Sequence, residues 1–152
     1  MRIQSTIKNR KKGFTLVELV VVIAVLAILA AIAIPVVAYT LNNSKVSVAA
    51  SNAKLVEQAF KEANAEIAVE KSTIYTASSD ISDVFNKNGI TDIESSVTLN
   101  SITYDLMWSK SKEQCDYVNT SNAVDITGKA ITAADWTIKI SPTDKTKISS
   151  LF

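Results

Sequence analysis

The sequence predicts an α+β fold in which one long N-terminal helix packs on a small antiparallel β-sheet. Three observations lead to this prediction. An apolar segment near the N-terminus is long enough to cross a membrane, and the segment after it carries a one-sided apolar stripe with helical spacing. The C-terminal half alternates apolar and polar residues, as half-buried strands do. A chain of 152 residues is expected to form one folded domain beyond such a membrane segment.

The first 41 residues divide into a basic leader and an apolar helix. Residues 1–13 contain five basic and no acidic side chains, and no charge occurs from Leu19 to Ser44. As a helix, that uncharged stretch extends about 39 Å, enough to cross a hydrocarbon core of about 30 Å. We therefore predict a basic leader at residues 1–13 and a membrane helix at residues 14–41, with its basic end on the cytoplasmic side.

Glu18 stands almost at the start of this apolar helix. A carboxylate at the centre of a membrane helix costs about 2.5 to 3.5 kcal/mol, so such a residue needs a partner. Cleavage after Gly13 would supply one, because it would free an amine on Phe14, and the pKa of such an amine is ordinarily about 7.7 to 8.0. Phe14 and Glu18 are four residues apart, so the pair could close within one chain or between adjacent chains. The simpler alternative is a glutamate at the level of the lipid headgroups.

This N-terminus resembles that of type IV prepilins, whose pattern is a basic leader, a Gly, a Phe or Met, the sequence Thr-Leu-(Ile/Val)-Glu and an apolar helix. Here the pattern is Lys12-Gly13, Phe14, Thr15-Leu16-Val17-Glu18 and then Leu19 to Leu41. Pro35 also matches the family, which commonly has a proline deep in this helix. We expect Pro35 to kink the helix or loosen its preceding turn. The resemblance implies cleavage between Gly13 and Phe14, methylation of the Phe14 nitrogen, and an assembly role for Glu18 together with Phe14.

The resemblance implies a structural protein without enzymatic activity. It would be a type IV pilus subunit, processed by a prepilin peptidase and methyltransferase. A pilus assembly platform with its ATPase would then polymerise it through packing of its N-terminal helix with other copies. The precursor would lie in the cytoplasmic membrane, and the assembled form in an extracellular pilus on the bacterial surface, where it could serve adhesion. Two alternatives stay open: a pseudopilin of a secretion or DNA-uptake machine, and a membrane-anchored adhesin that never polymerises, which Glu18 disfavours.

The globular part is predicted at residues 42–152 and begins with an amphipathic half of the same helix at residues 42–71. About three heptads are too few for a free coiled coil, and the many alanines of the stripe suit close packing against a sheet. We expect the helix to end between Glu70 and Thr73. The apolar stripe recurs at alternating intervals of three and four residues: Val46, Ala49, Ala53, Val56, Phe60, Ala63 and Ile67.

A connecting loop is predicted at residues 72–96. It is expected to contain a short helical turn near Ile81 to Asn86, with Ser79 or Asp80 as the N-cap and Gly89 as the stop.

An antiparallel sheet is predicted at residues 97–152, because its short strand patterns have no helical pattern between them. Pro142 is expected to stop the last strand. The strand patterns are Val97 and Leu99, Ile102 to Trp108, Val124 and Ile126, and Trp136 to Ile140, with a turn or bulge at Asn100-Ser101 and a turn at Thr127-Gly128.

The sequence lacks the groups that catalysis and metal binding use most often. It contains no histidine and three scattered glycines, so we predict no catalytic residues, no metal and no cofactor. Cys115 is the single cysteine, which excludes the intrachain disulfide loop of many pilins, and we expect it to be a small core or edge residue. The chain after the leader contains fifteen acidic residues and eleven lysines, so its side chains are acidic in sum. This charge gives no reason to require a nucleic-acid partner.

Overall fold

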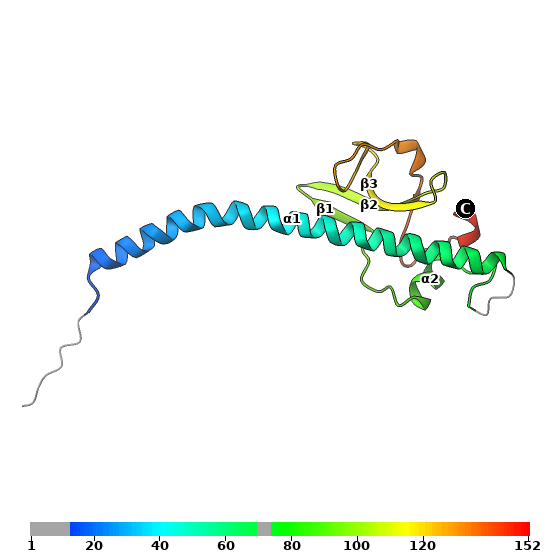
Figure 1. The fold of residues 1–152 in the computed structure, drawn as a ribbon, viewed down its shortest axis with the longest axis horizontal. Coiled ribbons are helices and arrows are strands. Elements are labelled where there is room, and N and C mark those ends of the chain that lie inside the picture. Colours follow the sequence, from blue (N-terminus) through cyan, green and yellow to red (C-terminus); the bar gives the residue numbers. More distant parts are fainter. Residues whose placement is uncertain (1–12, 70–73) are drawn as a thin grey trace, which may run out of the picture. The chain divides into compact units, whose positions relative to one another are not determined.

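The structure is a computed structural model, and it describes residues 13–69 and 74–152. The fold is α+β, as predicted: a long N-terminal helix, α1 (Leu16–Ala68), packs on a small antiparallel sheet (Figure 1). The chain forms two compact units, Met1–Thr40 and Leu41–Phe152. The first contains the apolar part of α1, and the second contains the rest of α1 together with the sheet.

The apolar stripe of α1 faces the core of the second unit, which confirms the predicted packing on a sheet. Val46 and Ile67, at the two ends of the stripe, are partly buried against the core. Ala59 is buried in addition, because it lies beside the stripe on the same face. The helix ends at Ala68, and the predicted end between Glu70 and Thr73 lies outside the described residues. The stripe residues buried in the core are Ala49, Ala53, Val56, Phe60 and Ala63.

A second helix, α2 (Ile81–Lys87), lies where the sequence predicts a helical turn. Asp80 is its N-cap: the Asp80 carboxylate accepts from the Asp83 backbone N–H at 3.0 Å, and the Asp83 carboxylate accepts from the Asp80 N–H at 3.0 Å. This reciprocal capping box satisfies two backbone donors that a helix start otherwise leaves free. Gly89 follows the helix with a φ of 63°, a conformation that favours glycine, which confirms the predicted stop.

The sheet is antiparallel. Its strand order is β1-β2-β3-β4, and β5 also pairs with β2. β1 pairs with β2 up to Asp105, whereas β5 pairs with Met107 and Trp108, so the two short strands share one edge of β2. Neighbouring Asn100 and Ser101 have φ values of 49° and 67°, which is the geometry of a two-residue hairpin turn and confirms the predicted turn. The strand bounds are β1 (Ser96–Leu99), β2 (Ile102–Ser109), β3 (Gln114–Asn119), β4 (Val124–Asp125) and β5 (Ile138–Lys139).

Two features of the sheet differ from the prediction. The sequence patterns miss β3, a central strand that pairs with both β2 and β4. The prediction of a strand beginning at Trp136 is wrong, because Trp136 follows a 3-10 turn at Ala133–Asp135. Trp136 packs with Met107 and Val118 in a separate small cluster. Met107 alternates along β2 with side chains of the main core, so this cluster covers the other face of the sheet.

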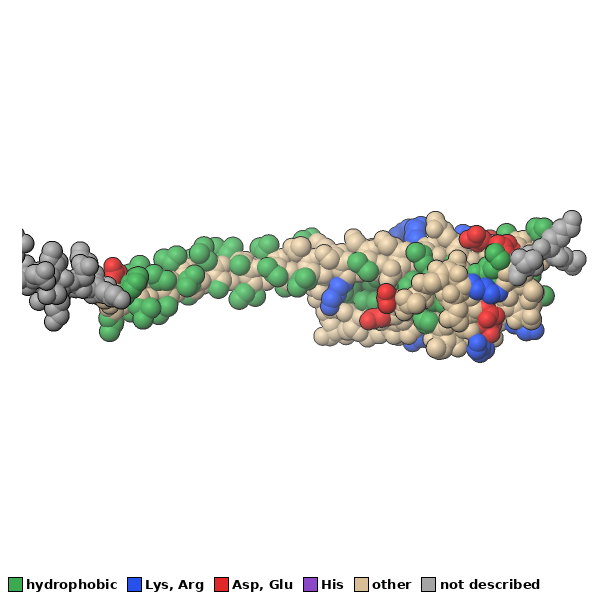
Figure 2. All heavy atoms as spheres, turned by 90° about the horizontal axis from the view of Figure 1, so that it is seen from below, with side chains coloured by type: hydrophobic (Ala, Val, Ile, Leu, Met, Phe, Trp, Pro, Cys, Tyr) green, Lys and Arg blue, Asp and Glu red, His purple; other side chains and the backbone are tan. Residues whose placement is uncertain are grey.

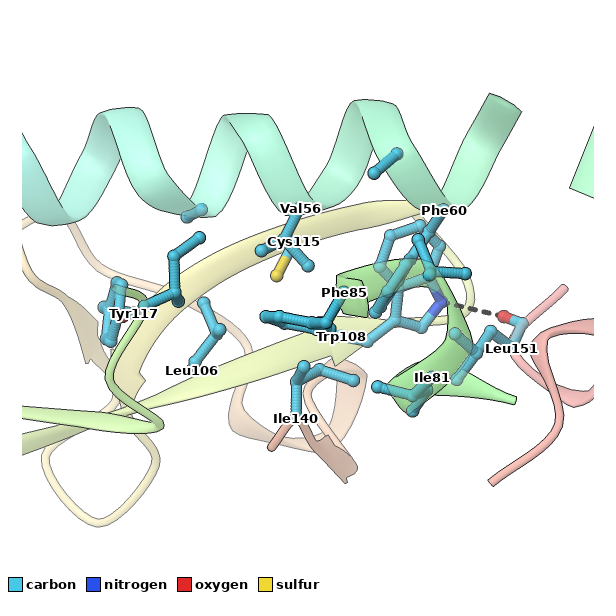
Figure 3. Packing of buried hydrophobic residues seen from close by; sticks show 14 of the residues in the cluster. Val56, Phe60, Ile81, Phe85, Leu106, Trp108, Cys115, Tyr117, Ile140 and Leu151 are labelled. Carbon is cyan, nitrogen blue, oxygen red and sulfur yellow. Dashed lines mark hydrogen bonds between the residues drawn. The ribbon is translucent and has the colours of Figure 1, made fainter. Parts of the chain in front are cut away.

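The main core joins α1, α2, the sheet and the C-terminal segment (Figure 3). Phe60 of α1 packs against the Trp108 ring of β2 with their centroids 5.7 Å apart. The Trp108 indole N–H donates to the Leu151 carbonyl at 2.7 Å, which ties the C-terminal segment to the centre of the sheet. Cys115 is buried in this core, as predicted.

Candidate functional site

The predicted cleavage site lies just before α1. Gly13 is exposed, and a Cβ atom added there would meet no other atom within 4 Å. The folded chain therefore has no packing reason to require glycine at this position. Phe14 follows with 90% of its surface exposed, so its ring also has no packing role within the chain.

Thr15 and Glu18 form a capping box at the start of α1. The Glu18 Oε2 atom accepts from both the backbone N–H and the hydroxyl of Thr15, each at 2.9 Å. In return, the Glu18 backbone N–H donates to Thr15 Oγ1 at 3.2 Å. The pattern Thr-x-x-Glu is the signature of such a box, so the sequence carried a signal for a capping role of Thr15 that we did not predict. Glu18 thus has a local role in starting the helix.

The capping box uses one oxygen of the Glu18 carboxylate. Oε1 accepts no hydrogen bond from the described residues, so it is available to a cation. The carboxylate also lies in the first turn of α1, where the helix dipole favours a negative charge. The structure contains the uncleaved chain, in which the Phe14 nitrogen belongs to a peptide bond and is not the free amine of a processed chain.

The part of α1 that follows is apolar on all sides. Its large hydrophobic residues from Leu16 to Leu41 are each 48–78% exposed, and Figure 2 shows hydrophobic side chains all along this part of the helix. Among the described residues, α1 is the helix that is long and apolar enough to cross a membrane. A helix that is hydrophobic all round requires lipid or other helices around it.

Pro35 lies inside α1, and the helix continues on both sides of it. Proline has no backbone N–H, so the carbonyl of Ala31 loses its usual helical donor. One turn later, the Thr40 hydroxyl donates to the Val36 carbonyl at 2.9 Å. A kink at Pro35 stays a prediction.

These features together make a recognisable N-terminal signal, and comparison with known families identifies it. Residues 8–34 match the prokaryotic N-terminal methylation motif. This type IV prepilin-like signal supports a pilin family. It indicates a structural, non-enzymatic protein, implies processing by a prepilin peptidase, and fits a membrane-anchored precursor together with the apolar helix. No curated protein and no solved structure matches the chain.

The second unit contains little reactive chemistry. Within residues 13–69 and 74–152, no group of three or more His, Cys, Asp or Glu side chains is placed to hold a metal ion. Burial raises the pKa of the Cys115 thiol well above its ordinary value, which keeps it protonated and unreactive. The Glu57 carboxylate accepts from the Cys115 backbone N–H at 3.3 Å and pairs with Lys61 at 2.8 Å, so it links α1 to the sheet.

Proposed function

We propose that this protein is the structural subunit of a type IV pilus, cut between Gly13 and Phe14, methylated on the Phe14 nitrogen and polymerised through α1. The observation that carries the proposal is Glu18, a carboxylate with one unoccupied oxygen at the start of an apolar helix. An uncharged side chain could also cap Thr15, so the capping role alone does not call for a charge beside a membrane segment, where a charge without a partner is costly.

The apolar part of α1 has two successive environments in this proposal. In the precursor, lipid surrounds it, and the second unit lies outside the cytoplasmic membrane. In the filament, the same side chains pack against the helices of other copies. The partners are a prepilin peptidase and methyltransferase, an assembly platform with its ATPase, and further copies of this chain in an extracellular pilus.

Glu18 would set the position of each new subunit. Cleavage converts the Phe14 nitrogen into an amine, which is largely cationic at neutral pH. The Glu18 Oε1 atom can accept a hydrogen bond from this amine while Oε2 stays in the capping box with Thr15. In the apolar centre of a filament, an amine from a neighbouring chain and this carboxylate would each be costly alone, so their pairing fixes one stagger between subunits.

Processing is tested by the mass of the surface form. We expect a chain that begins at Phe14 and carries one added methyl group. Gly13→Leu is expected to fold normally, because nothing surrounds this position, and to accumulate uncut because the added side chain obstructs the peptidase. A surface form that begins at Met1, or beyond Ala31, would refute the proposed cleavage.

The charge and the capping role of Glu18 can be separated by two substitutions. Glu18→Gln keeps an oxygen that can cap Thr15 but removes the charge, whereas Glu18→Val removes both. Breaking a buried ion pair costs about 3 to 5 kcal/mol, so both variants are expected to be exported and cut but to form few fibres in electron micrographs. Glu62→Gln, an exposed site farther along α1, is the matched control. Normal fibres from Glu18→Gln would show that the charge is dispensable and would refute the proposed pairing with the Phe14 amine. A complete absence of fibres from the unsubstituted chain would favour the non-polymerising alternative.

A further inference from the structure

The second unit has an apolar cleft between the start of its α1 segment and β1. Its volume is about 500 Å³. Leu41 and Val48 line it from α1 and are 58% and 60% exposed, and Val97 and Tyr117 line it from the sheet. Figure 2 shows a hollow on this face, with hydrophobic side chains at its bottom and charged side chains of both signs beside it. We call this feature the α1–β1 cleft.

Three charged side chains line the α1–β1 cleft. Lys45 comes from α1, and Asp92 and Glu94 come from the segment before β1. All three are exposed, and none forms an ion pair with another described residue. The cleft therefore offers one cation and two anions around an apolar surface.

The walls of the cleft are held in place by hydrogen bonds. The Tyr117 hydroxyl donates to the Glu94 carbonyl, and the Leu106 N–H donates to the Ser95 carbonyl at 2.8 Å, so the acidic segment is fixed to the sheet. On the other side, the Asn42 side chain donates to that of Asn100 at 3.0 Å and joins α1 to the β1–β2 turn. The charged side chains thus project from a fixed frame.

The place of the cleft in the chain indicates what can reach it. Lys45 is the first charged residue after Glu18, directly after the uncharged stretch that ends at Ser44. Lysines just beyond a membrane-length apolar segment lie at the depth of the lipid headgroups. In the membrane-anchored precursor, the ligand that is always present at this depth is a phospholipid.

We propose that the α1–β1 cleft binds the headgroup of phosphatidylethanolamine. The proposal rests on the membrane-anchored precursor of the proposed function. Lys45 pairs with the lipid phosphate, Asp92 and Glu94 accept from the primary ammonium group, and the first acyl carbons lie against Leu41 and Val48. The headgroup of phosphatidylglycerol has no cation, so its phosphate would lie near two carboxylates that stay unpaired. The ammonium group of phosphatidylcholine is charged but has no N–H donor. The expected preference is therefore phosphatidylethanolamine, then phosphatidylcholine, then phosphatidylglycerol.

The test uses the full chain purified in detergent and mixed with equal amounts of the three lipids, with identical acyl chains. Native mass spectrometry then counts the lipids retained. Lys45→Gln is expected to reduce retention of phosphatidylethanolamine by about fivefold, the upper range for one exposed ion pair. The double variant Asp92→Asn with Glu94→Gln is expected to lose the preference for phosphatidylethanolamine over phosphatidylglycerol. Lys129→Gln and Glu113→Gln, which are exposed and outside the cleft, are the matched controls.

Two results would overturn this proposal. One is an unchanged lipid ratio in the double variant, with thermal unfolding like that of the unsubstituted chain. The other is a lipid-free dimer cross-linked efficiently through Val48→Cys, which would assign the cleft to a second copy. The N-terminal mass of each variant separates this proposal from the pilin assignment. If the chain is cut after Gly13 but shows no headgroup preference, the lipid proposal fails and the pilin assignment stands. If the chain is uncut but shows the preference, the pilin assignment fails and the lipid proposal stands.

Discussion

The C-terminal segment is held in the core without a disulfide, and its contribution to stability can be measured. Leu151 has no exposed surface, and its carbonyl accepts the indole N–H of Trp108 at 2.7 Å. Phe152 packs edge-on against the Trp108 ring with their centroids 5.1 Å apart. The perturbation we choose is Leu151→Ala, which removes the buried side chain and keeps the backbone acceptor.

The expected loss of unfolding free energy is large for a small protein. A buried leucine replaced by alanine costs about 2 to 5 kcal/mol, because the surrounding side chains collapse only partly into the cavity. A domain of ordinary stability has about 5 to 15 kcal/mol in total. With middle values of about 3.5 kcal/mol for the loss and about 2 kcal/mol per molar for the urea dependence, the unfolding midpoint should fall by about 2 M urea.

The assay is urea unfolding of the full chain in detergent micelles, followed by tryptophan fluorescence. Both tryptophans, Trp108 and Trp136, lie in the second unit, so the signal reports on that unit and not on the membrane helix. Ser149→Ala, at an exposed position two residues away, is the control and should leave the midpoint unchanged. A Leu151→Ala midpoint equal to that of Ser149→Ala would show that the C-terminal segment does not stabilise the core.

Three further predictions concern the sheet and its strands. Burial raises the pKa of Asp116 above its ordinary value of 3.8, so the folded chain binds this proton more tightly than the unfolded chain. The stabilising contribution of this group should therefore fall as the pH rises from about 4 through the raised pKa, and Asp116→Asn should remove that dependence in urea midpoints measured across this range. Ser101→Gly should stabilise the second unit by about 1 kcal/mol, because a left-handed conformation costs most residues about 1 to 2 kcal/mol and glycine very little; an unchanged or lowered melting temperature would contradict this. Cys115 should resist a neutral thiol reagent in the folded chain and react in urea, as mass spectrometry would show, because its thiol is buried and protonated; rapid labelling without urea would refute the burial.

Parts of the fold with a strong local signal were predictable from the sequence. The stripe from Val46 to Ile67 repeats with the period of a helix and faces the core. The cap at Asp80 and the stop at Gly89 were predictable for the same reason, since both depend on backbone groups within a few residues. Thr15 also carried a local signal, the spacing to Glu18, which is plain once the hydrogen bonds are known.

Other parts depended on neighbours far along the chain. β3 has only a short alternation around Cys115 and Tyr117, and it is a strand because β2 and β4 supply hydrogen-bond partners on both sides. Trp136 fits an alternating pattern with Ile138, but Met107 and Val118 on the other face of the sheet provide its apolar surroundings. No local sequence pattern could decide whether Trp136 belongs to a strand with Ile138 or to the small cluster on the other face of the sheet.

The sequence by itself determined the N-terminal pattern of this protein: a basic segment, Gly13 before Phe14, a carboxylate at Glu18 and an apolar stretch of membrane length. These features depend on residue types in a fixed order along a short stretch of chain, so they can be recognised without any contact between distant residues. The tertiary structure alone decided how the second unit is closed, with Leu151 bound to Trp108, and where Lys45, Asp92 and Glu94 meet around one cleft. Such contacts join residues about 40 or more positions apart, and the chain brings them together only when burial of the whole core outweighs the conformational entropy that folding removes.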